Sequence, residues 1–269
     1  MVAALLIFLI TAAVQSSSAF AAQTGQLCLA CHPPHYVERG VCTACHRGNP
    51  ASDRRNIAHQ QLITGRYAAF TLGGSPLLRR GELFLEQYAC RRCHVIGGRG
   101  NRLSVNLDHS VERKTPEAIT ASILQPVQNM PDFHMDEPRA VQLVNALLAE
   151  AGRQQTPSGD QRQVVHFDRS GLQGKDLFSA KCGPCHRALT VRLGGLGKGD
   201  AGPNLSGLLS PYYPKSFRDK GRWKERDLGE WLKNPRRIRP LATMQPVILT
   251  EPEFRELVEI LKVEGVEVK

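Results

Sequence analysis

The sequence predicts a mainly α-helical protein in which two small helical domains stand in tandem after a short segment with little regular structure. Apolar residues recur at helical spacing between 136 and 151 and again between 250 and 261. The second repeat begins at Thr250, which forms a capping box with Glu253. The segment 23–66 instead holds four of the eight cysteines in a span too short to build its own apolar core.

One five-residue pattern occurs four times and uses every cysteine. Each copy has two cysteines separated by two residues and a histidine directly after the second; the copies are Cys28–His32, Cys42–His46, Cys90–His94 and Cys182–His186. This pattern is the attachment signature of a c-type haem. The thiols form thioether bonds to the two vinyl groups of the porphyrin, and the histidine ligates the iron from one face. The sequence therefore predicts four covalently attached haem c groups, held by Cys28, Cys31, Cys42, Cys45, Cys90, Cys93, Cys182 and Cys185.

Structural zinc, a disulfide framework and a thioredoxin-like redox pair also use cysteines at this spacing. None of them requires a histidine directly after the second cysteine, and histidine makes up only 9 of the 269 residues. Four such placements favour haem at every copy, with zinc as the alternative at the first two pairs.

The amino terminus has the composition of an export signal. Residues 2–14 are almost wholly apolar, and 16–21 supply a small-residue cleavage region. We expect 1–22 to be a signal peptide, although no Lys or Arg precedes the apolar run. Retention as an uncleaved anchor is the alternative, but the run is shorter than the roughly 20 residues of a comfortable membrane span.

The formal net charge of +10 does not indicate nucleic-acid binding. Each haem carries two propionates, so four haems would remove up to about eight positive charges. Many Arg and Lys side chains then have a partner within the protein, and we expect no nucleic-acid partner.

Two six-coordinate haems need four axial ligands, and the segment 23–66 contains four histidines and no methionine. Its histidines are His32, His35, His46 and His59. His32 and His46 are proximal by position. His35 lies too close to His32 to reach the far face of the same haem, so we assign it to the second haem and His59 to the first. The reverse pairing stays open.

The region 67–155 is expected to be a monohaem domain. A helix from Pro76 to Tyr88 leads into the third motif, with Leu78, Leu83, Phe84 and Leu85 available for its apolar face. Further helices begin after Thr115 and at Asp136. The distal ligand is a methionine in the loop before the last helix, either Met130 or Met135.

The region 156–269 is expected to be a second monohaem domain. Its motifs occur in the order G-x-x-L-F from Gly174, C-x-x-C-H, G-P-N-L at 202–205, W-L-x-N-P at 231–235, Met244 and a terminal helix. This order resembles class I cytochrome c over most of 170–265. The resemblance implies that Met244 is the sixth iron ligand, that the Pro203 carbonyl receives the hydrogen bond of the His186 ring, and that Trp231 packs near the haem. It also implies that Gly174 lets the first and last helices cross closely.

The two monohaem domains can be aligned through their methionine loops. Met130 stands six residues before Asp136, and Met244 stands six residues before Thr250. This register favours Met130, whereas a register counted from the preceding prolines favours Met135. The middle domain lacks G-P-N-L, with Val105-Asn-Leu in its place, so the sequence does not say which carbonyl holds the His94 ring.

The predicted ligands then number two for each of the four irons. The predicted ligands are His32, His35, His46, His59, His94, Met130, His186 and Met244. An iron with both faces occupied changes oxidation state but does not bind a substrate. The sequence therefore favours electron transfer over enzyme activity. The alternatives are a reductase or peroxidase subunit with one open iron site and a cytochrome that polymerises outside the cell.

The bis-histidine pair is expected at lower potential than the histidine–methionine haems, so electrons would run from 23–66 toward the later domains. By resemblance, the protein is periplasmic or on the outer face of the inner membrane, with an extracellular location also possible. Its role would be respiratory, with redox proteins as partners, including a cytochrome b-type quinol-oxidising membrane complex. The basic stretch Lys215–Arg239 could steer an acidic partner.

Overall fold

A computed structural model describes residues 27–127, 129–153 and 176–263. The chain divides between Thr64 and Gly65 into two compact units, and each is described by itself. The described residues are mainly helical, as the sequence predicts, and their only sheet is one short hairpin. The expected signal peptide 1–22, Gly174 and the boundary between 67–155 and 156–269 lie outside the described residues. In the described ranges no helix has the length and apolar character needed to cross a membrane.

The first unit is built from single helical turns. They are the 3-10 turns η1 (Leu27–Ala30) and η2 (Val37–Arg39) and the short helices α2 (Cys42–His46) and α3 (Arg55–Ala58). None of these four elements buries a residue. Backbone hydrogen bonds tie them together, from Asn49 N–H to the Ala58 carbonyl at 2.9 Å and from Ile63 N–H to the His46 carbonyl at 2.7 Å. These turns therefore contribute no buried side chain to an apolar core.

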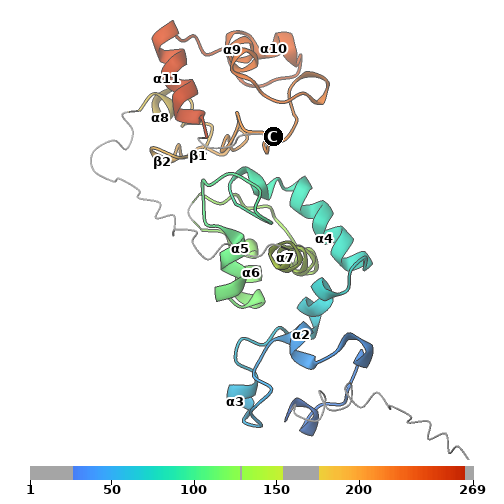
Figure 1. Cartoon of the computed structure of the whole chain (residues 1–269). Coiled ribbons are helices and arrows are strands. Elements are labelled where there is room, and N and C mark those ends of the chain that lie inside the picture. Colours follow the sequence, from blue (N-terminus) through green and yellow to red (C-terminus); the bar gives the residue numbers. More distant parts are fainter. Residues whose placement is uncertain (1–26, 128, 154–175, 264–269) are drawn as a thin grey trace, which may run out of the picture. The chain divides into compact units, whose positions relative to one another are not determined.

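The second unit begins with a helical bundle around α7 (Figure 1). Its elements are η3 (Gly65–Thr71), α4 (Pro76–Gln87), η4 (Cys90–Arg92), α5 (Leu107–Arg113), α6 (Pro116–Leu124) and α7 (Glu137–Gly152). Helix α7 packs against η3, α4, α5 and α6 and buries nearly all of its residues from Ala140 to Ala149. Helix α7 is the apolar centre of the bundle that carries the third motif.

The helix starts follow from their caps. The side chains of Ser75, Thr115 and Asp136 accept backbone N–H groups at the starts of α4, α6 and α7, and each of these helices has a proline in its first turn. Helix α4 buries Leu78 and Leu85, but Leu83 is 59% exposed, so its expected place on the apolar face was wrong. Residues 78, 81 and 85 share one helical face, and 83 lies on the opposite one.

The remainder of the second unit carries the fourth motif. Its elements are α8 (Leu177–Lys181), the antiparallel strands β1 (Ala188–Thr190) and β2 (Gly194–Leu196), η5 (Arg218–Lys220), α9 (Glu225–Lys233), α10 (Pro235–Ile238) and α11 (Glu251–Leu261). The predicted capping box of Thr250 and Glu253 is confirmed at the start of α11. This helix packs against α8 and β1 through a core that includes Phe178 and Leu257.

Helices α4 and α7 cross at Gly81. A methyl group there would overlap the Gln142 carbonyl and lie 3.0 Å from the Ala146 Cβ. We expect Gly81→Ala to lower the free energy of unfolding by about 2 kcal/mol, because overpacking pushes the helices apart. Gly152→Ala is the matched control, since a methyl group at the end of α7 meets nothing within 4 Å. It should leave stability unchanged or raise it by less than about 1 kcal/mol. Urea unfolding of the haem-loaded proteins measures both, and equal stabilities would contradict the close crossing.

Candidate haem sites

Every cysteine motif folds as one helical turn. The histidine N–H donates to the carbonyl of the first cysteine in the first, third and fourth copies, at 3.0, 3.1 and 2.9 Å. The second copy is helix α2 itself. This geometry places both thiols and the following imidazole of each copy around one turn, which is what attachment along one porphyrin edge requires. None of the eight cysteines forms a disulfide.

Three of the four motif imidazoles are held in the same way. The Nδ1 atoms of His46, His94 and His186 lie 2.8 Å from the carbonyl oxygens of Ile63, Val105 and Pro203. A carbonyl can only accept, so Nδ1 carries the proton and the Nε2 lone pair is available for iron. The Pro203 bond agrees with the resemblance to class I cytochrome c. The Ile63 and Val105 carbonyls could not be identified from the sequence.

The pKa values of the motif side chains follow from burial. Burial lowers the pKa of the His94 imidazole despite its hydrogen bond to Val105, which keeps the ring neutral, the form that binds a metal. Burial and the neighbouring Cys93 raise the pKa of Cys90 to about 12. Burial and Asp176 raise that of Cys182 to about 11. These two thiols are therefore neutral at physiological pH while no group is bound to them.

A cavity of about 380 Å³ opens beside the third motif. It lies in the size range of ligand pockets, about 300–1,000 Å³, and has a mostly apolar wall with few polar groups. Its lining includes Cys90, Cys93, His94, Met130, Phe133 and Leu147. Met130 thus shares the cavity with the proximal histidine. Met135 is 7% exposed and is not among the lining residues.

The four histidines of the first unit form two ring pairs. The rings of His32 and His59 have centroids 5.9 Å apart with their planes at 39°. The rings of His35 and His46 are stacked at 5.5 Å and 7°. The structure therefore brings together the same partners that the spacing of His32 and His35 suggests.

The fourth motif lies under a loop shaped around its histidine. A Cβ at Gly202 would fall within 2.9 Å of the His186 Nε2 atom and closer still to other ring atoms, so only glycine lets the imidazole lie flat on this backbone. His186 is 8% exposed. Met244 packs at the edge of the apolar core that includes Phe178 and Leu257, and the Trp231 Nε1–H donates to its sulfur at 3.0 Å. Trp231 in turn meets Trp223 edge to face at 5.7 Å.

Two further histidines are engaged at the surface. His109 Nδ1 lies 3.8 Å from a Glu112 carboxylate oxygen, and His134 Nδ1 lies 3.3 Å from one of Asp132. Neither residue lines the cavity beside the third motif.

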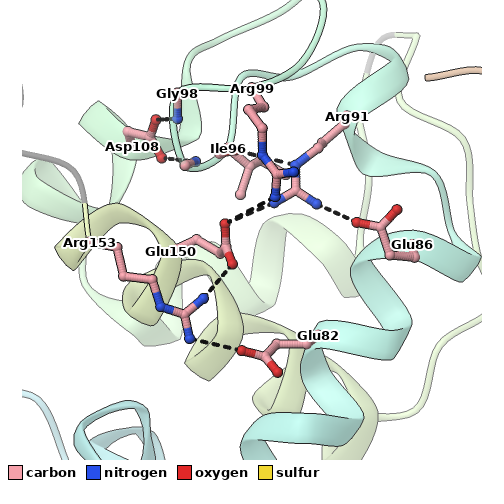
Figure 2. A network of polar contacts seen from close by, with 10 residues as sticks. Glu82, Glu86, Arg91, Ile96, Gly98, Arg99, Asp108, Glu150 and Arg153 are labelled. Carbon is pink, nitrogen blue, oxygen red and sulfur yellow. Dashed lines mark hydrogen bonds and ion pairs between the residues drawn. The ribbon is translucent and has the colours of Figure 1, made fainter. Parts of the chain in front are cut away.

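A network of charged groups locks the third motif onto the bundle (Figure 2). Arg91, between the two cysteines, reaches Glu150 of α7 at 2.9 Å and Glu86 of α4 at 2.5 Å, and donates to the Ile96 carbonyl at 3.3 Å. Glu150 also pairs with Arg153 at 2.6 Å. Only 8% of the Arg91 side chain and 13% of the Glu150 side chain are exposed. The Arg91 and Glu150 charges are therefore largely shielded from water, and each needs the other as a partner because burying an unpaired charge is costly.

A second anchor in Figure 2 fixes the loop after the motif. The Asp108 carboxylate accepts the backbone N–H groups of Gly97 and Gly98 at 2.8 and 2.9 Å. Asp108 is 7% exposed at the start of α5. The loop that leads to the Val105 carbonyl is thereby tied to a helix.

We expect Glu150→Gln to lower the free energy of unfolding by about 3 kcal/mol, because it leaves the Arg91 charge largely buried with a weaker set of partners. Glu137→Gln is the matched control at an exposed ion pair, Arg66–Glu137, whose side chains are 49% and 56% exposed. Water screens that exposed pair, so its loss should cost much less than the loss of Glu150. Urea unfolding of both haem-loaded variants gives the comparison. Similar decreases in the free energy of unfolding of the two variants would show that the buried pair contributes no more to stability than the exposed pair.

The comparison with known families agrees with this geometry. The family model described as cytochrome C oxidase, cbb3-type, subunit III, matches residues 76–145, which include the third motif, Met130 and most of the residues that line the cavity. No solved structure matches the chain. The matched region is therefore a c-type cytochrome domain, which binds haem c covalently and transfers electrons.

Proposed function

We propose that the chain is an exported tetrahaem cytochrome c that carries electrons in a respiratory chain. The observation that carries this proposal is the repetition of one site plan. Each of four helical turns presents two cysteines and a histidine, and three of the histidines have Nδ1 bound to a carbonyl and Nε2 available for iron. The cytochrome domain at 76–145 contains one of the four turns, and the other three repeat its sequence pattern.

The first two irons would each have two histidine ligands. The rings of His35 and His46 have centroids 5.5 Å apart and nearly parallel planes. Their proximity supports a shared iron, toward which each ring would turn the in-plane lone pair of one nitrogen. The pair of His32 and His59, at 5.9 Å, supports the same arrangement for the first haem.

The last two irons would each have a histidine and a methionine. Met130 lines the cavity that the His94 ring enters, which supports it over Met135. Met244 accepts from Trp231 and packs against the apolar core that includes Cys182 of the fourth motif, which supports it as the second ligand there. Bound haem c supplies reversible one-electron chemistry at iron, and the protein sets its potential through axial ligands, hydrogen bonds and burial. With all eight ligand positions filled, the chain would transfer electrons and bind no substrate at iron.

The ligand types give the expected direction of electron flow. A bis-histidine pair at lower potential in the first unit would pass electrons toward the histidine–methionine haems of the second. A quinol-oxidising membrane complex with a cytochrome b-type subunit is the proposed donor, and periplasmic or extracellular proteins are the proposed acceptors.

Mass spectrometry and ligand binding test the proposal. The mature protein should carry the added mass of four haems, and its resting reduced form should not bind carbon monoxide. In spectroelectrochemistry the two bis-histidine haems should titrate below the other two. Fewer than four haems would contradict the tetrahaem assignment. A haem that takes up carbon monoxide would favour a reductase or peroxidase with one open iron site.

We expect Met130→Leu to abolish the iron–sulfur charge-transfer absorption of one haem and to lower its potential, because leucine cannot ligate iron. Met135→Leu is the matched control in the same loop and should leave both unchanged. The reverse result would move the ligand to Met135. Optical titration of the two proteins, each with its haem content measured, separates these outcomes.

We also propose that the Lys215–Arg239 region is the docking surface for an acidic redox partner. Arg236 and Arg237 are exposed on α10, and Leu241, four residues after Arg237, is 95% exposed. Exposed positive charges with an apolar side chain close in sequence suit a short-lived complex in which charge steers the encounter.

We expect the double reversal Arg236→Glu/Arg237→Glu to slow reduction or oxidation by an acidic cytochrome at low salt by about tenfold or more, and high salt to remove the difference. Arg79→Glu/Arg80→Glu is the control, since it reverses two exposed neighbouring arginines on α4. Stopped-flow rates at several ionic strengths measure the effect. If both double variants react like the unchanged protein, docking through this surface is excluded.

A further inference from the structure

The third motif touches the loop that holds the fourth histidine. Arg92, the second residue between Cys90 and Cys93, donates its Nη1–H to the Asn204 carbonyl at 3.2 Å. Asn204 directly follows Pro203, whose carbonyl accepts from the His186 ring at 2.8 Å. The attachment turn of one haem is thus one hydrogen bond and one peptide away from the bond that orients the iron ligand of the next.

A second contact starts from a haem-bearing sulfur. The Cys93 side chain makes a hydrogen bond with the Ser206 side chain. Ser206 is 1% exposed, and its Oγ also accepts the Leu189 N–H at 2.7 Å. A thioether sulfur keeps its lone pairs, so the hydroxyl can still donate to it after haem attachment.

Buried polar side chains hold the two segments together. Asn101 is fully buried, and its Nδ2 donates to both the Arg92 carbonyl and the Ser210 Oγ, each at 2.8 Å. The Tyr213 hydroxyl donates to the Asn204 carbonyl at 3.2 Å, and the Arg92 guanidinium lies 5.8 Å from the centre of its ring. Buried polar groups tied into such a network fix one arrangement of the chain.

The backbones approach so closely that a side chain would not fit. Gly207 has φ +68°, and a Cβ there would lie 2.7 Å from both the Arg92 carbonyl oxygen and the Asn101 Nδ2. Its absence allows the loop 202–207 to lie directly against the third motif. The contact is therefore dense, polar and built from both attachment regions.

We propose that this contact, from the Cys90–His94 turn to the loop 202–207, is the electron-transfer route between the third and fourth haems, with Arg92 and Asn101 as its positioning residues. The inference rests on the proposed function, which places haem at both motifs. Electron tunnelling slows exponentially with distance and is faster through bonded and hydrogen-bonded atoms than across gaps. One electron would leave the ferrous iron of one haem and reduce the ferric iron of the other, with no proton transferred and no other reactant.

The contact also explains why the two arginines of the third motif are not equivalent. Arg91 turns inward to Glu150 and Glu86 and holds the motif on its own bundle. Arg92 turns toward the loop of the fourth motif. Only Arg92 therefore has a role between haems.

Photoreduction of the full haem-loaded chain, followed optically, measures the rate between the third and fourth haems. Met130→Leu, if it shifts the spectrum as expected, identifies the third haem in the signal. We expect Arg92→Met to lower this rate at least about tenfold, because positioning of the two groups is lost. Arg92→Lys should recover part of the rate. Haem content and both midpoint potentials should stay unchanged, which separates a route from a merely structural role. Arg113→Met, an exposed arginine of α5, is the matched control and should not change the rate.

Gly207→Val provides a second disruption, since its side chain would push the segments apart, and it should also slow the transfer. An unchanged rate in both Arg92→Met and Gly207→Val, with four haems present, would overturn the inference and leave the proposed function intact. Fewer than four haems in the unchanged protein would instead overturn the proposed function itself.

Discussion

The structure depends on one repeated interaction, the hydrogen bond from an imidazole Nδ1–H to a backbone carbonyl. It is 2.8 Å long at His46, His94 and His186, although the carbonyls come from unrelated loops 17, 11 and 17 residues away. Each bond fixes the ring tautomer, and each requires the chain to return to the motif at a set point. The loops, the glycine under the His186 ring and the anchor of Asp108 can all be understood as means of making that return.

The two units satisfy this requirement with different resources. The second has a helical core around α7 and a second core beneath α11, so protein packing alone can position its loops. The first has single turns that bury nothing, and its Ile63 carbonyl is held near His46 by a short backbone ladder. Covalently attached haem would supply the apolar mass that this unit lacks. Haem would therefore occupy a helical core that already exists in the second unit, whereas it would form the core of the first unit.

The sequence was informative wherever side-chain identity determines the structure. Caps at Thr115, Asp136 and Thr250 placed three helices, and the histidine spacing indicated the ring pairs of the first unit. It was uninformative where a backbone group makes the contact. The Val105 and Ile63 carbonyls have no residue-type signature, and helix α5 carries too few apolar residues in periodic order to stand out. The contact of Arg92 with Asn204 joins segments more than a hundred positions apart, which local patterns do not encode.

The raised thiol pKa values bear on the order in which the protein matures. A neutral, desolvated Cys90 or Cys182 is a weak nucleophile, so a domain that has already closed is a poor acceptor for its cofactor. Sulfur–carbon bond formation is favoured while the motif is still open to solvent, and closure of the helices then follows around a group already in place. Haem attachment at these two motifs would therefore precede closure of the helices around them.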